Sequence, residues 1–164
     1  MSLLVRNIYE NRLHNQIKIV TNPLTQQSRF DKFLFSTIEE GGALSAFGVE
    51  HDQEGKEINK NLTYQTLGLS LDFLIANNFI TERPNLIKVD VDGTEHLVLA
   101  GATETLKHPT CRSALIETST SFLEQSKAIS EILTECGFSP EKLQSRMVAG
   151  GKFRNPVNRI WHKS

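Results

Sequence analysis

Hydrophobic and polar positions in the second half of the chain alternate between the period of a strand and that of a helix. The predicted elements there, in chain order, are a strand at residues 86–91, a helix at 94–107, a strand at 113–117 and a helix at 122–136 that stops before Gly137. This order predicts an α/β fold with parallel strands joined by right-handed crossovers. Residues 157–162 have the pattern of an edge strand at the end of the chain.

The first half of the chain has a less regular pattern. Its predicted elements are a helix at residues 3–12, strands at 16–20, 29–36 and 62–67, loops at 39–43 and 51–61, and a short helix around 71–75. We therefore expect a β-rich insertion around residues 29–67, within a single domain that spans residues 1–164.

Composition limits the kind of protein. The chain has 164 residues, with 18 Lys and Arg against 19 Asp and Glu, and a formal net charge of −1. This length suits one domain, and the charge balance does not favour a nucleic-acid partner. No apolar run approaches the roughly 20 residues that cross a bilayer, and the first residues do not resemble a signal peptide. Cys111 and Cys136 are expected to be reduced core thiols, so we predict a cytoplasmic protein with no membrane partner.

Carboxylates gather where the predicted strand at 86–91 ends. Asp90 and Asp92 are expected to share one face of this strand, since side chains alternate along it. Buried charges are costly, so we expect both at the open carboxyl end, where α/β sheets bind ligands. Glu117 ends the next strand, about 4.8 Å away in a sheet, and could border the same cleft. Glu95 lies in the first turn of the following helix, where the helix dipole favours an acid.

A purely structural explanation of these acids remains open. In that case Asp92 and Gly93 would form a helix cap and turn, and Lys88 would be the ion-pair partner of Asp90. The pattern indicates a site without naming its chemistry.

Other kinds of chemistry have weaker support. His96 is a candidate base, but the histidines lack the spacing of a zinc site. The chain has neither a nucleophile elbow nor a phosphate-binding Gly-Lys-Ser/Thr loop. A Mg²⁺ ion bridging Asp90, Asp92 or Glu117 is a less favoured alternative, based on the preference of that ion for oxygen ligands.

The segment IKVDVDGTE at residues 87–95, followed by VLAGA at 98–102, resembles the signature of FkbM-type methyltransferases. That family usually has Glu where this chain has Asp92, a change that keeps the charge and shortens its reach. Further similarity lies in the helix with Leu4, Asn7, Ile8 and Asn11, in Ser70-Leu71-Asp72, and in Glu117. The resemblance covers most of the chain.

The resemblance implies a Rossmann-like class I methyltransferase fold with a mostly parallel sheet of strand order 3-2-1-4-5-7-6. In that alignment the chain begins at the helix before strand 3, and no Gly-x-Gly pattern occurs near its start. We therefore expect an N-terminally truncated domain with an incomplete cofactor site and an unpaired edge on strand 4. Alternatively, strands within residues 29–67 complete the sheet.

The implied activity is S-adenosylmethionine-dependent methyl transfer to a hydroxyl group of a small sugar or secondary-metabolite acceptor. The expected residues are Asp90, Asp92 and Glu95 for catalysis, Glu117 and His96 for the substrate, and Asn22 near the adenine. One alternative is a non-catalytic remnant or partner subunit, paired in a homo-oligomer or with a complementing N-terminal segment. Another is a metal-dependent enzyme with an acidic cleft.

Overall fold

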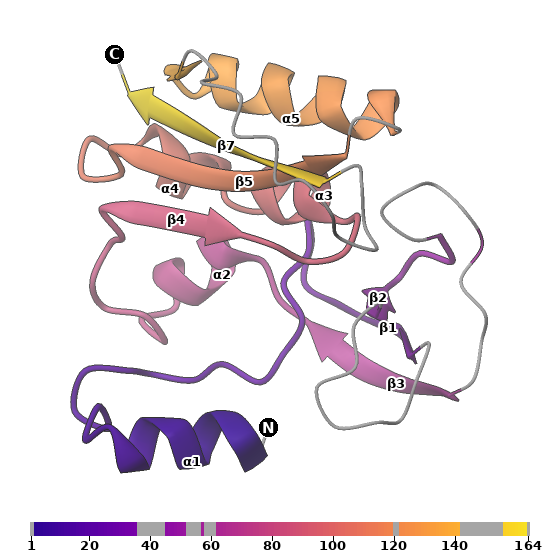
Figure 1. The fold of residues 1–164 in the computed structure, drawn as a ribbon, viewed down its shortest axis with the longest axis vertical. Coiled ribbons are helices and arrows are strands. Elements are labelled where there is room, and N and C mark those ends of the chain that lie inside the picture. Colours follow the sequence, from indigo (N-terminus) through magenta and orange to yellow (C-terminus); the bar gives the residue numbers. More distant parts are fainter. Residues whose placement is uncertain are drawn as a thin grey trace.

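The strands form two separate sheets in the computed structural model (Figure 1). The model describes residues 2–35, 45–51, 57, 62–119, 122–141 and 156–163. Within this part of the chain, no helix is long and apolar enough to cross a membrane.

The smaller sheet is antiparallel and contains the predicted β-rich insertion. Its central strand β1 (Arg29–Phe35) lies between β2 (Ser45–Phe47) and β3 (Leu62–Gly68). The strands predicted at 29–36 and 62–67 are thereby confirmed, whereas the three-residue β2 was not predicted. The predicted loop at 39–43, and most of the one at 51–61, lie outside the described residues.

The N-terminal region differs from its prediction. The helix α1 (Ser2–Glu10) is present, with Ile8 as its buried residue. The predicted strand at residues 16–20 is wrong, because that segment forms no strand in the structure. The first β-type pairing of this region comes later, at an isolated parallel bridge between Leu24 and Leu69. An alternating pattern forms a strand only where a neighbouring edge supplies hydrogen bonds.

The larger sheet has four strands. They are β4 (Leu86–Val89), β5 (Ser113–Ser119), β6 (Phe138–Pro140) and β7 (Pro156–Lys163), in the spatial order β4-β5-β7-β6. The β4–β5 pair is parallel, whereas β5–β7 and β6–β7 are antiparallel, so the sheet is mixed rather than mostly parallel.

This arrangement corrects two expectations. The C-terminal strand β7 lies inside the sheet, so its prediction as an edge strand is wrong. None of β1, β2 and β3 pairs with β4, so the insertion does not complete the larger sheet. The order β4-β5-β7-β6 does coincide with the last four positions of the order that the resemblance implies.

Three helices cover one face of the larger sheet. They are α3 (Glu95–Ala100), α4 (Thr103–Lys107) and α5 (Leu123–Glu135). Ala114 and Ile116 of β5 are buried against this layer, while Ser113, Leu115 and Glu117 alternate with them and are only partly buried. The predicted apolar stripe of α5 contributes Ile129, Leu133 and Cys136 to the core. Both cysteines are free and buried, as predicted.

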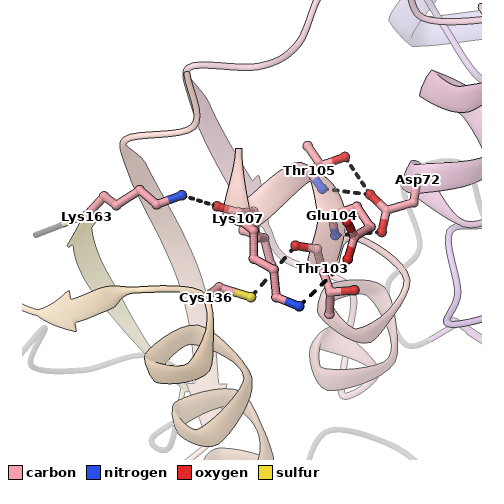
Figure 2. Close-up of polar contacts among 8 residues, drawn as sticks. Asp72, Thr103, Glu104, Thr105, Lys107, Cys136 and Lys163 are labelled. Atoms are coloured by element: carbon pink, nitrogen blue, oxygen red, sulfur yellow. Dashed lines mark hydrogen bonds and ion pairs between the residues drawn. The ribbon is translucent and has the colours of Figure 1, made fainter. Parts of the chain in front are cut away.

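The helix predicted over residues 94–107 is broken into α3 and α4. Gly101 lies at the break, where an added Cβ would approach the backbone oxygen of Thr25 to 2.1 Å. Asp72 then begins the second helix, since its carboxylate accepts bonds from the N–H groups of Glu104 and Thr105, both at 2.9 Å (Figure 2). Asp72 belongs to the first turn of the helix α2 (Leu71–Ala76).

The other end of α4 is attached to the C-terminal strand. Lys163 of β7 donates to the carbonyl oxygens of Leu106, at 2.6 Å, and His108, at 3.1 Å. A cation is favourable there because the last carbonyls of a helix carry partial negative charge. The short helix α4 is therefore bound at both ends by side chains from distant segments (Figure 2).

Candidate functional site

Asp90 and Glu117 lie side by side at the carboxyl end of β4. Val89 pairs with Ile116 in the parallel register. The next residues along the two segments, Asp90 and Glu117, therefore lie opposite each other. Burial raises the pKa of Glu117 to about 7, with further contributions from the charges of Asp90, Glu95 and Asp92 and from a hydrogen bond with Asp90. The structure thus brings these two acids together, as the strand pattern predicted.

Lys88 is the ion-pair partner of Asp90. Its Nζ lies 2.6 Å from Asp90 Oδ2, and the two side chains are 53% and 42% exposed. The hydrogen bond with Asp90 raises the pKa of Lys88. This is the ion pair that a purely structural role for Asp90 predicted. Because both side chains are exposed, the pair contributes little to the stability of the fold.

Asp92 lies in a tight turn rather than on the strand. The strand ends at Val89, two residues earlier than predicted, and Asp92 and Gly93 both have positive φ, of 53° and 109°. The expectation that Asp90 and Asp92 share a strand face is therefore wrong. Asp92 is nevertheless close to the other acids. Burial is the main cause of the raised pKa of Glu95 and of Glu117, and the charge of Asp92 adds to both shifts.

Glu95 is turned into the protein and is only 2% exposed. Its Oε1 accepts bonds from the N–H groups of Val91 and Gly93, at 3.2 and 3.3 Å, and its Oε2 accepts one from Gln125 of α5. Burial raises the pKa of Glu95, and the backbone bonds oppose that shift. A carboxylate enclosed in this way is suited to holding the turn, and the predicted catalytic role of Glu95 stays a prediction.

His96 lies beside Glu95 and is half-buried. Burial lowers its pKa, with a smaller contribution from the charge of His51, so the imidazole is neutral at pH 7. Its Nδ1 is buried and has no hydrogen-bond partner among the described residues. The ring of His51 stands edge-on to Phe122, with 5.5 Å between the ring centroids.

Sequence reasoning did not identify His51, Phe122 or Gln125 as neighbours of the site. His51 lies 45 positions before His96, and no spacing rule links residues that far apart. Gln125 is a polar residue in the first turn of a helix, a place where polar side chains are ordinary.

Asn22 is attached to the other sheet. Its side-chain amide donates a 2.9 Å bond to the carbonyl oxygen of Leu67 in β3. The predicted strand that was to place it near an adenine is not formed. Its role in cofactor binding stays a prediction.

The bound groups that the sequence suggested are a metal ion and S-adenosylmethionine. Among the described residues, no set of three or more His, Cys, Asp or Glu side chains is placed to hold a metal ion. The described part of the chain also has no glycine-rich turn after a strand that could approach S-adenosylmethionine closely, and the sequence holds no Gly-x-Gly pattern.

The amino-acid sequence was also compared with protein families, curated proteins and solved structures. The family model described as the methyltransferase FkbM domain matches residues 3–140. Comparisons with curated proteins and with solved structures gave no match.

Proposed function

The chain belongs to the FkbM methyltransferase family, and from that premise we propose that the acids after β4 and on β5 form the acceptor side of a methyl-transfer site. The proposed acceptor is a hydroxyl group of a small molecule such as a sugar or secondary metabolite. The observation that carries this proposal is the position of Glu117 beside Asp90, with a pKa of about 7. A general base works best when its pKa lies near the working pH.

In this mechanism Glu117 would take the proton of the acceptor hydroxyl and so make its oxygen more nucleophilic. Asp90, paired with Lys88, keeps the proton affinity of Glu117 high. Neutral His96 is available to accept or donate a hydrogen bond to the acceptor. S-adenosylmethionine, when bound, supplies the methyl group. The remaining contribution of the protein is to hold the reacting atoms in line.

We propose further that the larger sheet is the C-terminal half of a Rossmann-like sheet. The order β4-β5-β7-β6, with β7 antiparallel, supports this assignment. The outer edge of β4 has no partner among the described strands. In this proposal a strand from a second copy or from a complementing segment pairs there and completes the donor side.

The test of the function measures methyl transfer from radiolabelled S-adenosylmethionine to a panel of sugars and hydroxylated metabolites. The chain is assayed alone and together with candidate complementing segments. Replacing Glu117 with Gln should lower kcat by roughly 10²- to 10⁴-fold, the usual contribution of a general base. The control is Glu104→Gln, an exposed acid on α4.

Two results would count against the proposal. Equal methyl transfer by the Glu117→Gln variant and the unchanged chain would remove Glu117 from the reaction. Tight binding of S-adenosylmethionine by the isolated monomer would show that no second polypeptide is needed. The metal-dependent alternative has no support from the described geometry, since no candidate ligand set is present among those residues.

A further inference from the structure

Gln125 has an unusual position for an uncharged polar residue. It lies in the first turn of α5 and is only 2% exposed. Its Nε2 donates to Glu95, but its Oε1 is buried and has no hydrogen-bond partner among the described residues. Because an unsatisfied buried acceptor costs stability, an apolar side chain would suit simple packing better. The presence of a glutamine at this position points to the bond that its amide makes.

That bond joins two segments 30 residues apart around one carboxylate. Glu95 accepts from Gln125 on one side and from the N–H groups of Val91 and Gly93 on the other. A carboxylate only accepts hydrogen bonds, so the amide must present its nitrogen to Glu95. Glu95 therefore connects the start of α5 to the turn that follows β4.

The turn needs such support. Asp92 has a φ of 53°, in the left-handed region, which is disfavoured for L-residues although Asp tolerates it better than most. The N–H groups of Val91 and Gly93, on either side of Asp92, both donate to Glu95. Releasing them would let the turn relax, and Asp92 and Asp90 would move with it.

From these contacts we propose that Gln125 is a positioning residue, which acts through Glu95 to hold Asp90 and Asp92 against Glu117. This inference rests on the proposed function, because it explains how the acids of the acceptor side are kept together. Gln125 itself touches no reacting atom.

The first experiment compares Gln125→Leu with the unchanged chain by NMR. The leucine removes the amide that donates to Glu95 and replaces it with an apolar side chain of similar size. The amide protons of Val91 and Gly93 should exchange faster by roughly tenfold or more, the usual effect of losing a hydrogen bond to a charged group. Asp90 and Asp92 should also move away from Glu117, and water should reach its carboxyl group. The titration midpoint of Glu117 should therefore fall from about 7.

The matched control is Ser130→Ala on the same helix. It removes one hydrogen bond, from the Ser130 hydroxyl to the Ser126 carbonyl at 3.0 Å, without contact with the turn. We expect this variant to leave both the exchange of Val91 and Gly93 and the midpoint of Glu117 unchanged. A general loss of stability would affect the two variants alike.

A second variant, Gln125→Glu, keeps the size and polarity of the side chain. At pH 5 a protonated Glu at this position can donate to Glu95 and keep the turn closed. At pH 8 two carboxylates face each other, so the exchange of Val91 and Gly93 should become strongly dependent on pH. Packing alone would produce no such dependence.

Unchanged exchange and an unchanged Glu117 midpoint in both Gln125 variants would overturn the inference. These readouts do not use methyl transfer, so the inference can fail while the proposed function stands. Conversely, a Glu117 midpoint near 4.5 in the unchanged chain would remove the basis of the proposed function, whatever the exchange data show.

Discussion

Glu117 is the residue whose chemistry depends most on its neighbours. Its carboxyl group is partly buried on β5 and lies in the field of Asp90, Glu95 and Asp92. Each of these influences disfavours a further negative charge, and together they raise its pKa from 4.5 to about 7. The group is therefore partly protonated at neutral pH. This property has a consequence for stability that can be measured without a substrate.

Replacing Glu117 with Gln should make the protein more stable at pH 8 and leave its stability at pH 4 unchanged. Because the folded pKa lies above the unfolded value, the folded state binds the proton more tightly. This contribution to stability is fully present below pH 4.5 and is lost as the pH rises through about 7. We expect a gain of about 1 kcal/mol at pH 8, a modest value because the carboxyl is partly exposed to screening solvent. Urea unfolding across this pH range, with Glu104→Gln as control, measures the effect, and identical pH dependence in both variants would contradict it.

Replacing Asp90 with Asn should lower the pKa of Glu117. The charge of Asp90 is the largest contribution after burial, and its side chain also hydrogen-bonds to Glu117. A ¹³C NMR titration of the Glu side-chain carboxyls measures the midpoint directly. Glu82→Gln, a substitution of an exposed acid before β4, is the control. A midpoint that stays at about 7 in the Asp90→Asn variant would mean that burial alone sets the value.

The proximity of Asp90 and Glu117 could be predicted because it depends on local pattern and on the constant spacing of adjacent strands. The inward orientation of Glu95 could not. It depends on Gln125, which reaches the turn only after α5 packs against α3. The same reason explains why His51 was missed, since its position near His96 follows from the path of the chain between the two sheets.

At the scale of elements, periodicity identifies long helices and strands but not where they break. The apolar pattern over residues 94–107 continues through Gly101 without interruption, yet the close approach of Thr25 and the carboxylate of Asp72 divide it into two helices. β2 and β6 have three residues each, too few to show a period. β7 pairs with β5 in the interior of the sheet because of contacts more than 36 positions apart in the chain, which no local pattern contains.

Asp72→Ala should destabilise the protein by about 1–2 kcal/mol, the usual cost of losing a helix N-cap. The carboxylate accepts two backbone bonds at the start of α4 and a third from the Thr105 hydroxyl at 2.6 Å. The five-residue α4 has few bonds of its own to replace them. Urea unfolding measures the change, and Asp72→Asn should lose less because its amide oxygen still accepts.

The matched control for Asp72 is Glu104→Ala. The Glu104 side chain is exposed and forms a 3.7 Å ion pair with Lys107, so its loss should change the free energy of unfolding very little. Equal destabilisation by the substitutions at Asp72 and Glu104 would show that the cap does not hold α4 in place.

At the scale of the whole molecule, the larger sheet ends in two edge strands, β4 on one side and β6 on the other. The strands β5 and β7 are paired on both edges, whereas β4 pairs only with β5 among the described strands. Leu86, at the start of β4, is 60% exposed. An open edge with exposed apolar side chains favours the addition of another strand. This edge is also where the proposed donor side would be completed.

The register of β4 identifies which amides report on its open edge. The Asn85 carbonyl accepts from the N–H of Ser113. Since alternate residues of a parallel strand face each neighbour, Ile87 and Val89 direct their N–H groups towards β5. The N–H groups of Leu86 and Lys88 therefore point to the open side. In the chain alone, we expect fast hydrogen exchange at Leu86 and Lys88 and slow exchange at Ile87 and Val89.

Hydrogen exchange combined with sedimentation then distinguishes the two proposed partners. If the added strand belongs to a second copy, protection of Leu86 and Lys88 rises with protein concentration as the mass doubles. If it belongs to a complementing segment, both amides stay unprotected at every concentration until that segment is added. In either case Ile87 and Val89 serve as internal controls, because their bonds to β5 are present throughout. Protection of Leu86 and Lys88 in a chain that sediments as a monomer would mean that the edge is already covered, and the donor side would then need no second polypeptide to complete it.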